Sequence, residues 1–243
     1  MEDLGYSFGS AVREGTFMWT DYIIYALFGI ITIISWIVQQ ALQSKFKKYS
    51  QVELPFSGKE LAEKMLRDNG IDDVQVVSTE GQLTDHYNPS NRTVNLSQGV
   101  FDKRTVAAAA VAAHECGHAV QHSKSYAFLS LRSALVPAVN ISSKWMPWIL
   151  LLGIVFVQYT AIPLGIGIAL FAITTLFSFV TLPVEIDASR RAVAWLEEAQ
   201  ITTAETTPMA KDALRAAAYT YVIAALSSLA TLLYYVAIFM KRR

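Results

Sequence analysis

The stretch Ala113-His114-Glu115-Cys116-Gly117-His118-Ala119 has the pattern HExxH, with two histidines four residues apart and a glutamate directly after the first. It lies in a run of helix-forming residues, 103–122, which contains the alanine- and valine-rich segment 106–112. Residues four apart lie on one face of a helix, about 6 Å apart along its axis. The stretch therefore predicts a helix that directs two imidazoles toward one point.

The residue types of the motif suit a catalytic zinc ion. His114 and His118 can each place a ring nitrogen about 2 Å from one ion. Glu115 is rotated by about 100° from His114, so it is expected to reach a water molecule beside the ion. A carboxylate there accepts a proton from the water and passes it to the leaving amine. We expect one zinc ion with Glu115 as general base; the alternative is two ordinary polar residues on an amphipathic helix.

The chain around the motif is strongly apolar. Of its 243 residues, 53% are hydrophobic and 16% are charged, whereas about a quarter is the usual charged share. A helix that spans a bilayer needs about 20 predominantly apolar residues. The sequence thus predicts a mainly α-helical membrane protein with a small α+β domain, rather than a large soluble core. Four transmembrane helices are expected, the second and third separated only around Pro163: 22–42, 145–162, 164–184 and 218–240.

The basic residues predict the orientation in the membrane. They follow the first and third spans, and the hairpin between the second and third spans carries no charge. By the positive-inside rule, segment 1–21 is extracytoplasmic, and segments 43–125 and 185–217 are cytoplasmic. The basic end Lys241-Arg242-Arg243 disagrees with this orientation. Residues 126–144 are either an interfacial helix or an extension of the second membrane helix.

Local signals outline the cytoplasmic elements. Ser57-Gly58-Lys59-Glu60 is a capping box, and Gly70 is a stop signal, so a helix is expected over 59–69. Short strands are expected over 74–77, 83–87 and 93–96, with a turn at 88–91 between the last two. Further expected features are Asp102 as N-cap of the HExxH helix, a helix after Pro183 at the membrane face, and a final helix that starts at Thr207-Pro208.

A catalytic zinc site needs a third protein ligand and one open position. Among the acidic residues after the motif, Glu185 stands out because it directly follows the membrane hairpin. Two crossings return the chain to its starting side, which brings Glu185 to the face of the HExxH helix. Asp187 is the rival candidate.

Two further histidines are weaker candidates. His122 lies about 12 Å along the helix axis from His114, too far to share one ion with it. We therefore expect His122 to be solvated or to contact a ligand indirectly. His86, on an expected strand, either binds metal or substrate or is an ordinary surface histidine.

Charge and cysteine content exclude other classes. The formal net charge is zero, so no nucleic-acid partner is expected. The single cysteine, Cys116, rules out an intrachain disulfide and fits a reducing compartment.

Four stretches of specific spacing, the third of which contains the HExxH motif, mark a family: Asp85-His86-Tyr87-Asn88-Pro89, Val94-Asn95-Leu96-Ser97, Ala112-Ala113-His114-Glu115-Cys116-Gly117-His118-Ala119-Val120-Gln121 and Leu182-Pro183-Val184-Glu185-Ile186-Asp187-Ala188-Ser189-Arg190-Arg191-Ala192. Through them the chain resembles, over nearly its whole length, the YugP-type neutral zinc metallopeptidases of bacterial membranes. More distantly it is similar to the gluzincins of the HtpX and CAAX-prenyl-protease group. The resemblance implies a zincin-like domain around the HExxH helix.

The distant resemblance also implies roles for single residues. In that group a glutamate after a membrane hairpin is the third zinc ligand; carried over, it is Glu185. An aspartate four residues later supports the site there, but this chain has Ser189. Support is therefore expected from Asp187 or Arg190 instead.

The resemblance further suggests that strand 83–87 or 93–96 is an edge beside the active-site cleft. A substrate peptide would add to that edge as a further strand, and His86 or Tyr87 would help to stabilise the oxyanion. Ordinary sheet packing is the alternative.

These observations predict a zinc endopeptidase embedded in the plasma (inner) membrane, with its active site facing the cytoplasm. Its expected partners are peptide or protein substrates and the lipid bilayer; the sequence does not indicate an oligomeric state. The alternative is a catalytically inactive adaptor or assembly factor that zinc only braces. A metal transporter lacks support, because the membrane helices carry almost no ionisable residues.

Overall fold

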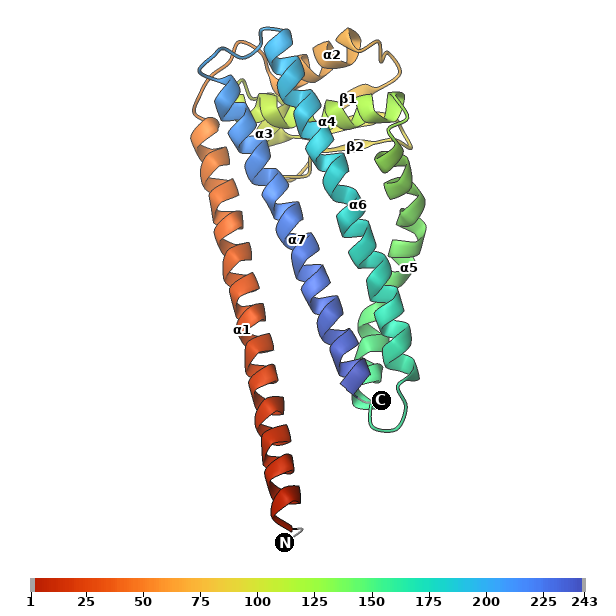
Figure 1. Cartoon of the computed structure of the whole chain (residues 1–243). Coiled ribbons are helices and arrows are strands. Elements are labelled where there is room, and N and C mark those ends of the chain that lie inside the picture. The colour runs from red at the N-terminus through yellow and green to blue at the C-terminus, as the bar shows by residue number, and fades with distance from the viewer. Residues whose placement is uncertain (1–2, 242–243) are drawn as a thin grey trace.

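Four long helices run side by side, and a group of short elements lies at one end of them (Figure 1). The computed structural model describes residues 3–241. The structure therefore does not describe the first two residues of the expected segment 1–21, nor the last two residues of the basic C-terminal end, Arg242 and Arg243. The elements in chain order are α1 (Asp3–Tyr49), α2 (Gly58–Asp68), β1 (Gln75–Thr79), β2 (His86–Asn88), β3 (Thr93–Ser97), α3 (Gln98–Phe101), α4 (Val106–Ser123), α5 (Ala127–Val155), α6 (Ile162–Glu198) and α7 (Thr207–Lys241).

The long helices confirm the predicted fold class. In the described part of the chain, four helical stretches are long and apolar enough to cross a membrane: Tyr25–Tyr49, Ala127–Val155, Ile162–Glu198 and Thr207–Lys241. Large apolar side chains on them are exposed, including Trp36, Trp148 and Leu233. Exposed apolar surface of this extent is expected where lipid, rather than water, surrounds a protein.

Several helix boundaries differ from the sequence prediction. The hairpin turn lies at residues 156–161, not around Pro163, which instead occupies the first turn of α6. A proline fits there because the first N–H groups of a helix have no intrahelical acceptor. Helix α6 also continues through Pro183, where a separate helix was expected. Residues 127–144 are the first part of α5, continuous with the expected second membrane segment.

The small domain is built from α2, α3, α4 and one sheet. The capping box is confirmed: Ser57 Oγ accepts from Glu60 N, and Glu60 accepts from Ser57 N. The sheet has the order β1-β3-β2, with β1 and β3 parallel and β2 and β3 antiparallel. Strand β2 starts at His86 rather than at residue 83, because Leu83 has a φ of 58° and cannot continue a strand.

Helix α4, which carries HExxH, lies in the centre of the domain and is buried nearly all round. Its alanines are buried, and it packs between α2 and the long helices α6 and α7. Small side chains allow this close approach from several sides, and a helix that is apolar all round is a buried helix. The N-cap is Thr105, whose hydroxyl accepts from Ala108 N; the expectation of Asp102 was wrong, since Asp102 ends α3.

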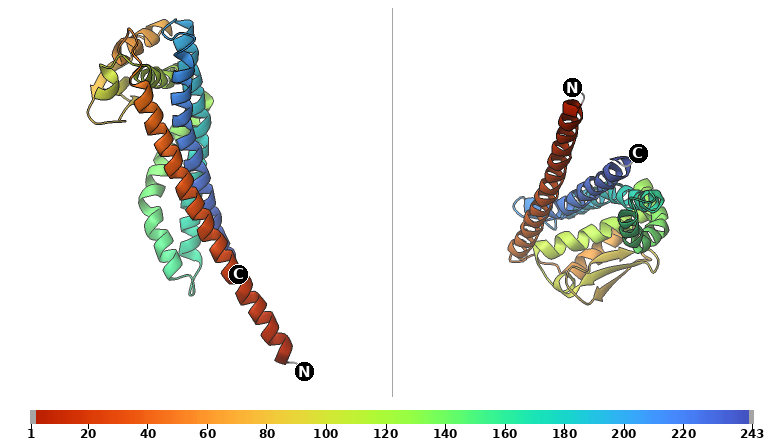
Figure 2. Two further views of the ribbon diagram at one scale, coloured as in Figure 1. Left: turned by 90° about the vertical axis from the view of Figure 1, so that its left-hand side faces the viewer. Right: turned by 90° about the horizontal axis from the view of Figure 1, so that it is seen from below.

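The two ends of the long helices differ. The sheet, α2 and α4 lie at one end, whereas the start of α1, the α5–α6 turn and the end of α7 lie at the other (Figure 1). Seen from below, the sheet lies beside the helices rather than over their centre, and α1 leans away from the other three (Figure 2). The membrane hairpin thus leaves from the domain and returns to it, which brings the start of α5 and the later part of α6 back to α4.

Candidate metal centre

Three side chains from two helices meet beside α4: His114, His118 and Glu185. Their candidate ligand atoms all lie within 4.8 Å of one another. Glu185 Oε2 lies 3.2 Å from His114 Nε2 and 3.6 Å from His118 Nε2. His118 and Glu185 are buried, and His114 is half-buried. The structure therefore brings together the three residues that the sequence proposed as metal ligands.

The donor set fits a zinc ion. Two imidazole nitrogens and one carboxylate oxygen are ordinary zinc ligands, with bonds of about 2.0–2.2 Å. Tetrahedral geometry at such bond lengths places neighbouring donors about 3.4 Å apart, close to the 3.2 and 3.6 Å found here. Glu115 is a second nearly buried carboxylate beside the group. A cation would balance the charge of these buried acids.

The contact between α4 and α6 depends on Gly117. A Cβ atom at this position would lie 2.6 Å from the carbonyl oxygen of Ala188. The absence of a side chain thus allows the backbone of α6 to approach the HExxH motif. This contact places Glu185, three residues before Ala188, beside the histidines.

A hydrogen-bonded chain holds His118. Gln121 Nε2 donates to Val184 O and to Asp187 Oδ2, both at 2.8 Å. These two acceptors fix the amide orientation, so Gln121 Oε1 accepts from His118 Nδ1 at 3.1 Å. His118 Nε2 is thereby left to bind a metal. Asp187 supports the site through Gln121, and Arg191 rather than Arg190 donates to it, at 2.6 Å.

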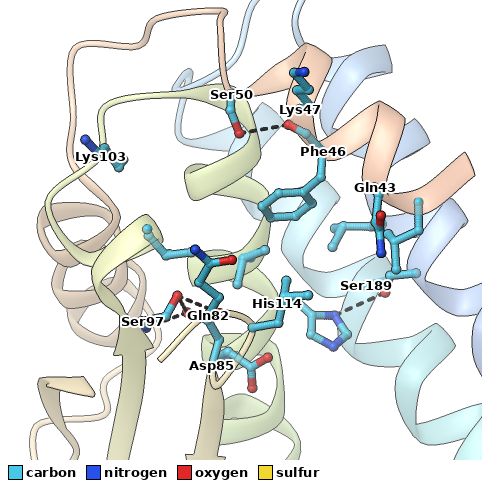
Figure 3. A pocket seen from close by; sticks show the side chains of 18 of the residues that line it. Gln43, Phe46, Lys47, Ser50, Gln82, Asp85, Ser97, Lys103, His114 and Ser189 are labelled. Carbon is cyan, nitrogen blue, oxygen red and sulfur yellow. Dashed lines mark hydrogen bonds between the residues drawn. The ribbon is translucent and has the colours of Figure 1, made fainter. Parts of the chain in front are cut away.

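Ser189 holds the other histidine. Its Oγ lies 3.1 Å from His114 Nδ1 (Figure 3). A hydroxyl can accept from Nδ1–H, which leaves His114 Nε2 free for a metal. From the sequence, support for the site was expected from Asp187 or Arg190 instead of Ser189. In the structure Ser189 nevertheless contacts the imidazole of His114.

Glu115 is fixed by the sheet. The backbone N–H of Tyr87, on the edge strand β2, donates to Glu115 Oε2 at 3.0 Å. Because β2 pairs with β3 through its other side, this N–H is one that the sheet leaves free. The edge of the sheet therefore orients the carboxylate of the motif.

The remaining candidates from the sequence lie outside the three-residue group. His86 is exposed, and its Nδ1 is 2.8 Å from Thr84 O. The Tyr87 hydroxyl lies 2.7 Å from His122 Nδ1, so these two side chains pair with each other. Cys116 faces the other side of α4, where its thiol contacts Ala62 O at 3.5 Å; burial raises the pKa of this thiol.

Two residues near Glu185 were missed in the sequence. Arg132, on α5, lies 3.5 Å from Oε1 of Glu185. The other carboxylate oxygen, Oε2, faces the two histidines. Tyr221, on α7, lies close enough to Glu185 for their side chains to interact. An arginine in an apolar helix is a signal that could have drawn attention to Arg132. Tyr221 gave no such signal among the other tyrosines of the last helix.

Electrostatics favour a cation at this place. Burial alone would lower the pKa of His118, but hydrogen bonding to Glu185 and the charges of Glu115 and Glu185 outweigh burial and raise it. The same negative surroundings that attract a proton to the imidazole attract a metal ion, which must displace that proton to bind.

The group opens onto a cleft of about 970 Å³. His114, Glu115 and Glu185 line it together with residues of α1, α7 and the loop before β2. Figure 3 shows His114 and Ser189 at one part of the cleft, with Lys47 and Lys103 farther along it. Two of the candidate ligands, His114 and Glu185, are therefore accessible to a molecule as large as a peptide segment.

Four apolar helices and a His–His–Glu group on a cleft define a membrane protein with a candidate zinc centre. The chain belongs to the family described as "Putative neutral zinc metallopeptidase", whose model matches residues 24–240. It is similar to the Bacillus subtilis (strain 168) protein named "Putative membrane protease YugP", with 42% identity over 224 residues that cover 89% of this chain and 98% of that protein. No solved structure matches the chain. The resemblance stated from the sequence is thus confirmed at the level of the family.

Proposed function

We propose that the protein is a membrane-embedded zinc endopeptidase that hydrolyses peptide bonds of membrane-associated proteins or peptides. The main observation behind this proposal is that His114, His118 and Glu185 lie together beside a cleft that Glu115 also lines. Membership of a zinc metallopeptidase family supports the same reaction.

His114, His118 and Glu185 would hold a single zinc ion. When bound, zinc acidifies water and polarises a carbonyl group, the two effects that peptide hydrolysis needs. Gln121 and Ser189 keep the Nδ1 atoms of the two imidazoles engaged, so that both Nε2 atoms face the site. The protein thus contributes an ordered set of ligands.

Glu115 is the general base in this proposal. Its carboxylate accepts a proton as a water oxygen adds to the scissile carbonyl carbon, and it returns that proton to the amine nitrogen when the C–N bond breaks. The Tyr87 N–H holds one oxygen of the carboxylate and so orients the group. Orientation of this kind lowers the entropic cost of reaching the transition state.

The proposed active site faces the cytoplasm from the plasma membrane. The start of α1, the α5–α6 turn and the end of α7 lie together at the end away from the metal centre, as an even number of crossings between them requires (Figure 1). The domain end carries basic residues near the helix ends, which favours the cytoplasmic side. Those residues are Lys45, Lys47, Lys48, Arg190, Arg191, Lys211 and Arg215. The parts that cross the bilayer would be 22–42, 164–184, 218–240 and the portion of α5 from residue 145.

The alternative function, a zinc-braced adaptor, is less well supported. Structural zinc sites are closed by four protein ligands, whereas catalytic sites use three and keep one position open. Among the described residues, the group contains three ligands and lies on a cleft wall.

Replacement of the base separates catalysis from metal binding. In Glu115→Gln we expect peptide hydrolysis to fall by about 10²- to 10⁴-fold, because proton transfer is lost. Zinc content should stay equal to that of the wild type, because all three ligands remain. Peptide-cleavage assays and metal analysis on the same purified protein measure both quantities.

Glu197→Gln is the matched control, because Glu197 is an exposed residue of α6. It should retain both zinc and activity. Full activity in a Glu115→Gln preparation free of wild-type protein would contradict the proposed mechanism.

A further inference from the structure

Hydrolysis of a peptide bond needs a group that stabilises the negative charge on the carbonyl oxygen. Hydrogen-bond donors placed for this purpose are among the largest contributors to enzymatic catalysis. The sequence offered His86 and Tyr87 for this role. In the structure, neither His86 nor Tyr87 is among the residues that line the cleft, and the Tyr87 hydroxyl pairs with His122. Residues that do line the cleft are therefore better placed to supply the donor.

Helix α7 supplies one wall of the cleft through a single helical face. The lining residues of this face are spaced as i, i+3, i+4 and i+7: Leu214, Ala217, Ala218 and Tyr221. Three of them are apolar, and Tyr221 is the last of the four. Its phenol is thus the polar group that α7 presents to the cleft, where the other three side chains offer no hydrogen bond.

Tyr221 lies at the metal centre and not merely somewhere in the cleft. Its side chain lines the cleft together with His114, Glu115 and Glu185, and it lies within hydrogen-bonding reach of Glu185. A phenol has an ordinary pKa of about 10, so at neutral pH it carries a proton that it can donate. Tyr221 therefore places a hydrogen-bond donor among the proposed base and one proposed ligand.

Arg132 determines which oxygen of Glu185 is available to a metal. It approaches Oε1 of Glu185 at 3.5 Å, while Oε2 faces both histidines. Glu185 can thus offer a single oxygen to a metal, because an arginine on α5 contacts the other. A carboxylate that binds through one oxygen leaves more of the coordination sphere open to substrate.

We propose that Tyr221 is a catalytic residue that donates a hydrogen bond to the scissile carbonyl oxygen as negative charge develops there, with Arg132 as the residue that positions Glu185. This inference rests on the proposed peptidase function. In the step itself, water oxygen forms a bond to the carbonyl carbon, the C=O π pair moves to oxygen, and Glu115 takes the water proton. Tyr221 donates a hydrogen bond but does not transfer its proton. When the C–N bond breaks, the leaving amine takes its proton from Glu115.

The test compares two tyrosines of the same helix. Tyr221→Phe removes the proposed donor, and Tyr219→Phe makes the same chemical change two residues away, where the hydroxyl accepts from Arg215 Nε at 3.0 Å. In zinc-loaded, full-length protein, Tyr221→Phe should lower kcat by about 10²- to 10³-fold. KM should change by less than about threefold, because the interaction forms in the transition state. Tyr219→Phe should match the wild type.

Two measurements besides activity exclude a structural role. Zinc content of Tyr221→Phe should equal that of the wild type. The affinity for a phosphinic peptide, which mimics the tetrahedral transition state, should fall by about the same factor as kcat. A Tyr221→Phe protein that keeps kcat and phosphinate affinity within about threefold of the wild type, or that loses activity only through lost zinc, overturns the inference.

Failure of the underlying function gives a different result. A zinc-loaded wild type that cleaves no peptide contradicts the proposed endopeptidase. In that case the phosphinate affinities alone decide the role of Tyr221: a fall confined to Tyr221→Phe supports the contact, and equal affinities overturn it.

Discussion

Helices α4 and α6 contribute to the same centre in different ways. Helix α4 supplies two candidate ligands, His114 and His118, whose relative position follows from helical spacing alone. Helix α6 supplies one, Glu185, whose position depends on the path of the chain through the membrane hairpin and on the contact at Gly117. Two of the three candidate ligands are thus positioned by local helical spacing, and the third is positioned by tertiary structure.

The difference shows where the site is vulnerable. A folded α4 keeps its two imidazoles on one face even if the long helices separate. Glu185 reaches them only when α5, α6 and α7 pack together and α6 lies against α4. Variants that act on one side or the other can therefore distinguish the local contribution from the tertiary one.

Removal of a ligand from either helix should have the largest effect. The free energy of zinc binding at sites with four protein ligands is about 10–16 kcal/mol. Divided equally, this is about 2.5–4 kcal/mol for each ligand. We therefore expect His118→Ala and Glu185→Ala each to weaken zinc binding roughly 10²- to 10³-fold and to abolish hydrolysis. Competition with a zinc chelator measures the affinity. Glu198→Ala, an exposed change on α6, is the control; zinc affinity unchanged in Glu185→Ala would refute its role as a ligand.

A change at the helix contact should have an intermediate effect. In Gly117→Ala the new Cβ would meet the Ala188 carbonyl oxygen at 2.6 Å, so α4 and α6 must move apart. Overpacking of this kind costs about 1–3 kcal/mol of stability. We expect a lower unfolding temperature together with weaker zinc binding, although every proposed ligand is still present.

The control for this change is Gly29→Ala on α1, where an added Cβ has no heavy atom within 4 Å. Its unfolding temperature and zinc affinity should stay at wild-type values. Equal behaviour of the two variants would show that the α4–α6 contact does not position Glu185.

Loss of an outer hydrogen bond should have the smallest effect. Ser189→Ala removes the group that faces His114 Nδ1 but leaves all three proposed ligands. A typical hydrogen bond contributes about 1 kcal/mol, so zinc affinity should fall by about fivefold. Ser178→Ala, also on α6 but bonded to Thr174 O, should leave the chelator titration unchanged. A loss as large as that in His118→Ala would mean that Ser189 does more than orient the imidazole.

Local patterns predicted much of the fold. The spacing of His114 and His118, the capping box at Ser57 and the long apolar segments all depend on neighbours within a few residues, and the structure confirms the elements that they predicted. Glu185 was also identifiable, because an even number of membrane crossings returns the chain to the same side. These inferences needed no side-chain packing.

Boundaries and supporting contacts were less predictable. Asp102 and Thr105 are both good N-cap residues, so propensity did not distinguish them; in the structure Thr105 caps α4 and Asp102 lies at the end of α3. Pro183 is tolerated inside α6, where a break was expected. Gln121 lies one helical turn after His118, so its contact was within reach of sequence analysis. Arg132 and Tyr221 come from other helices and become neighbours of Glu185 only after folding.

The order of the elements along the chain has a consequence for synthesis. The α4 histidines leave the ribosome before the α5–α6 hairpin has been made. A nascent domain would therefore hold two of the three proposed ligands and would bind zinc weakly. If the protein is the peptidase proposed above, it stays inactive until the hairpin has inserted into the bilayer. Membrane insertion would then serve the purpose that a removable propeptide serves in secreted proteases.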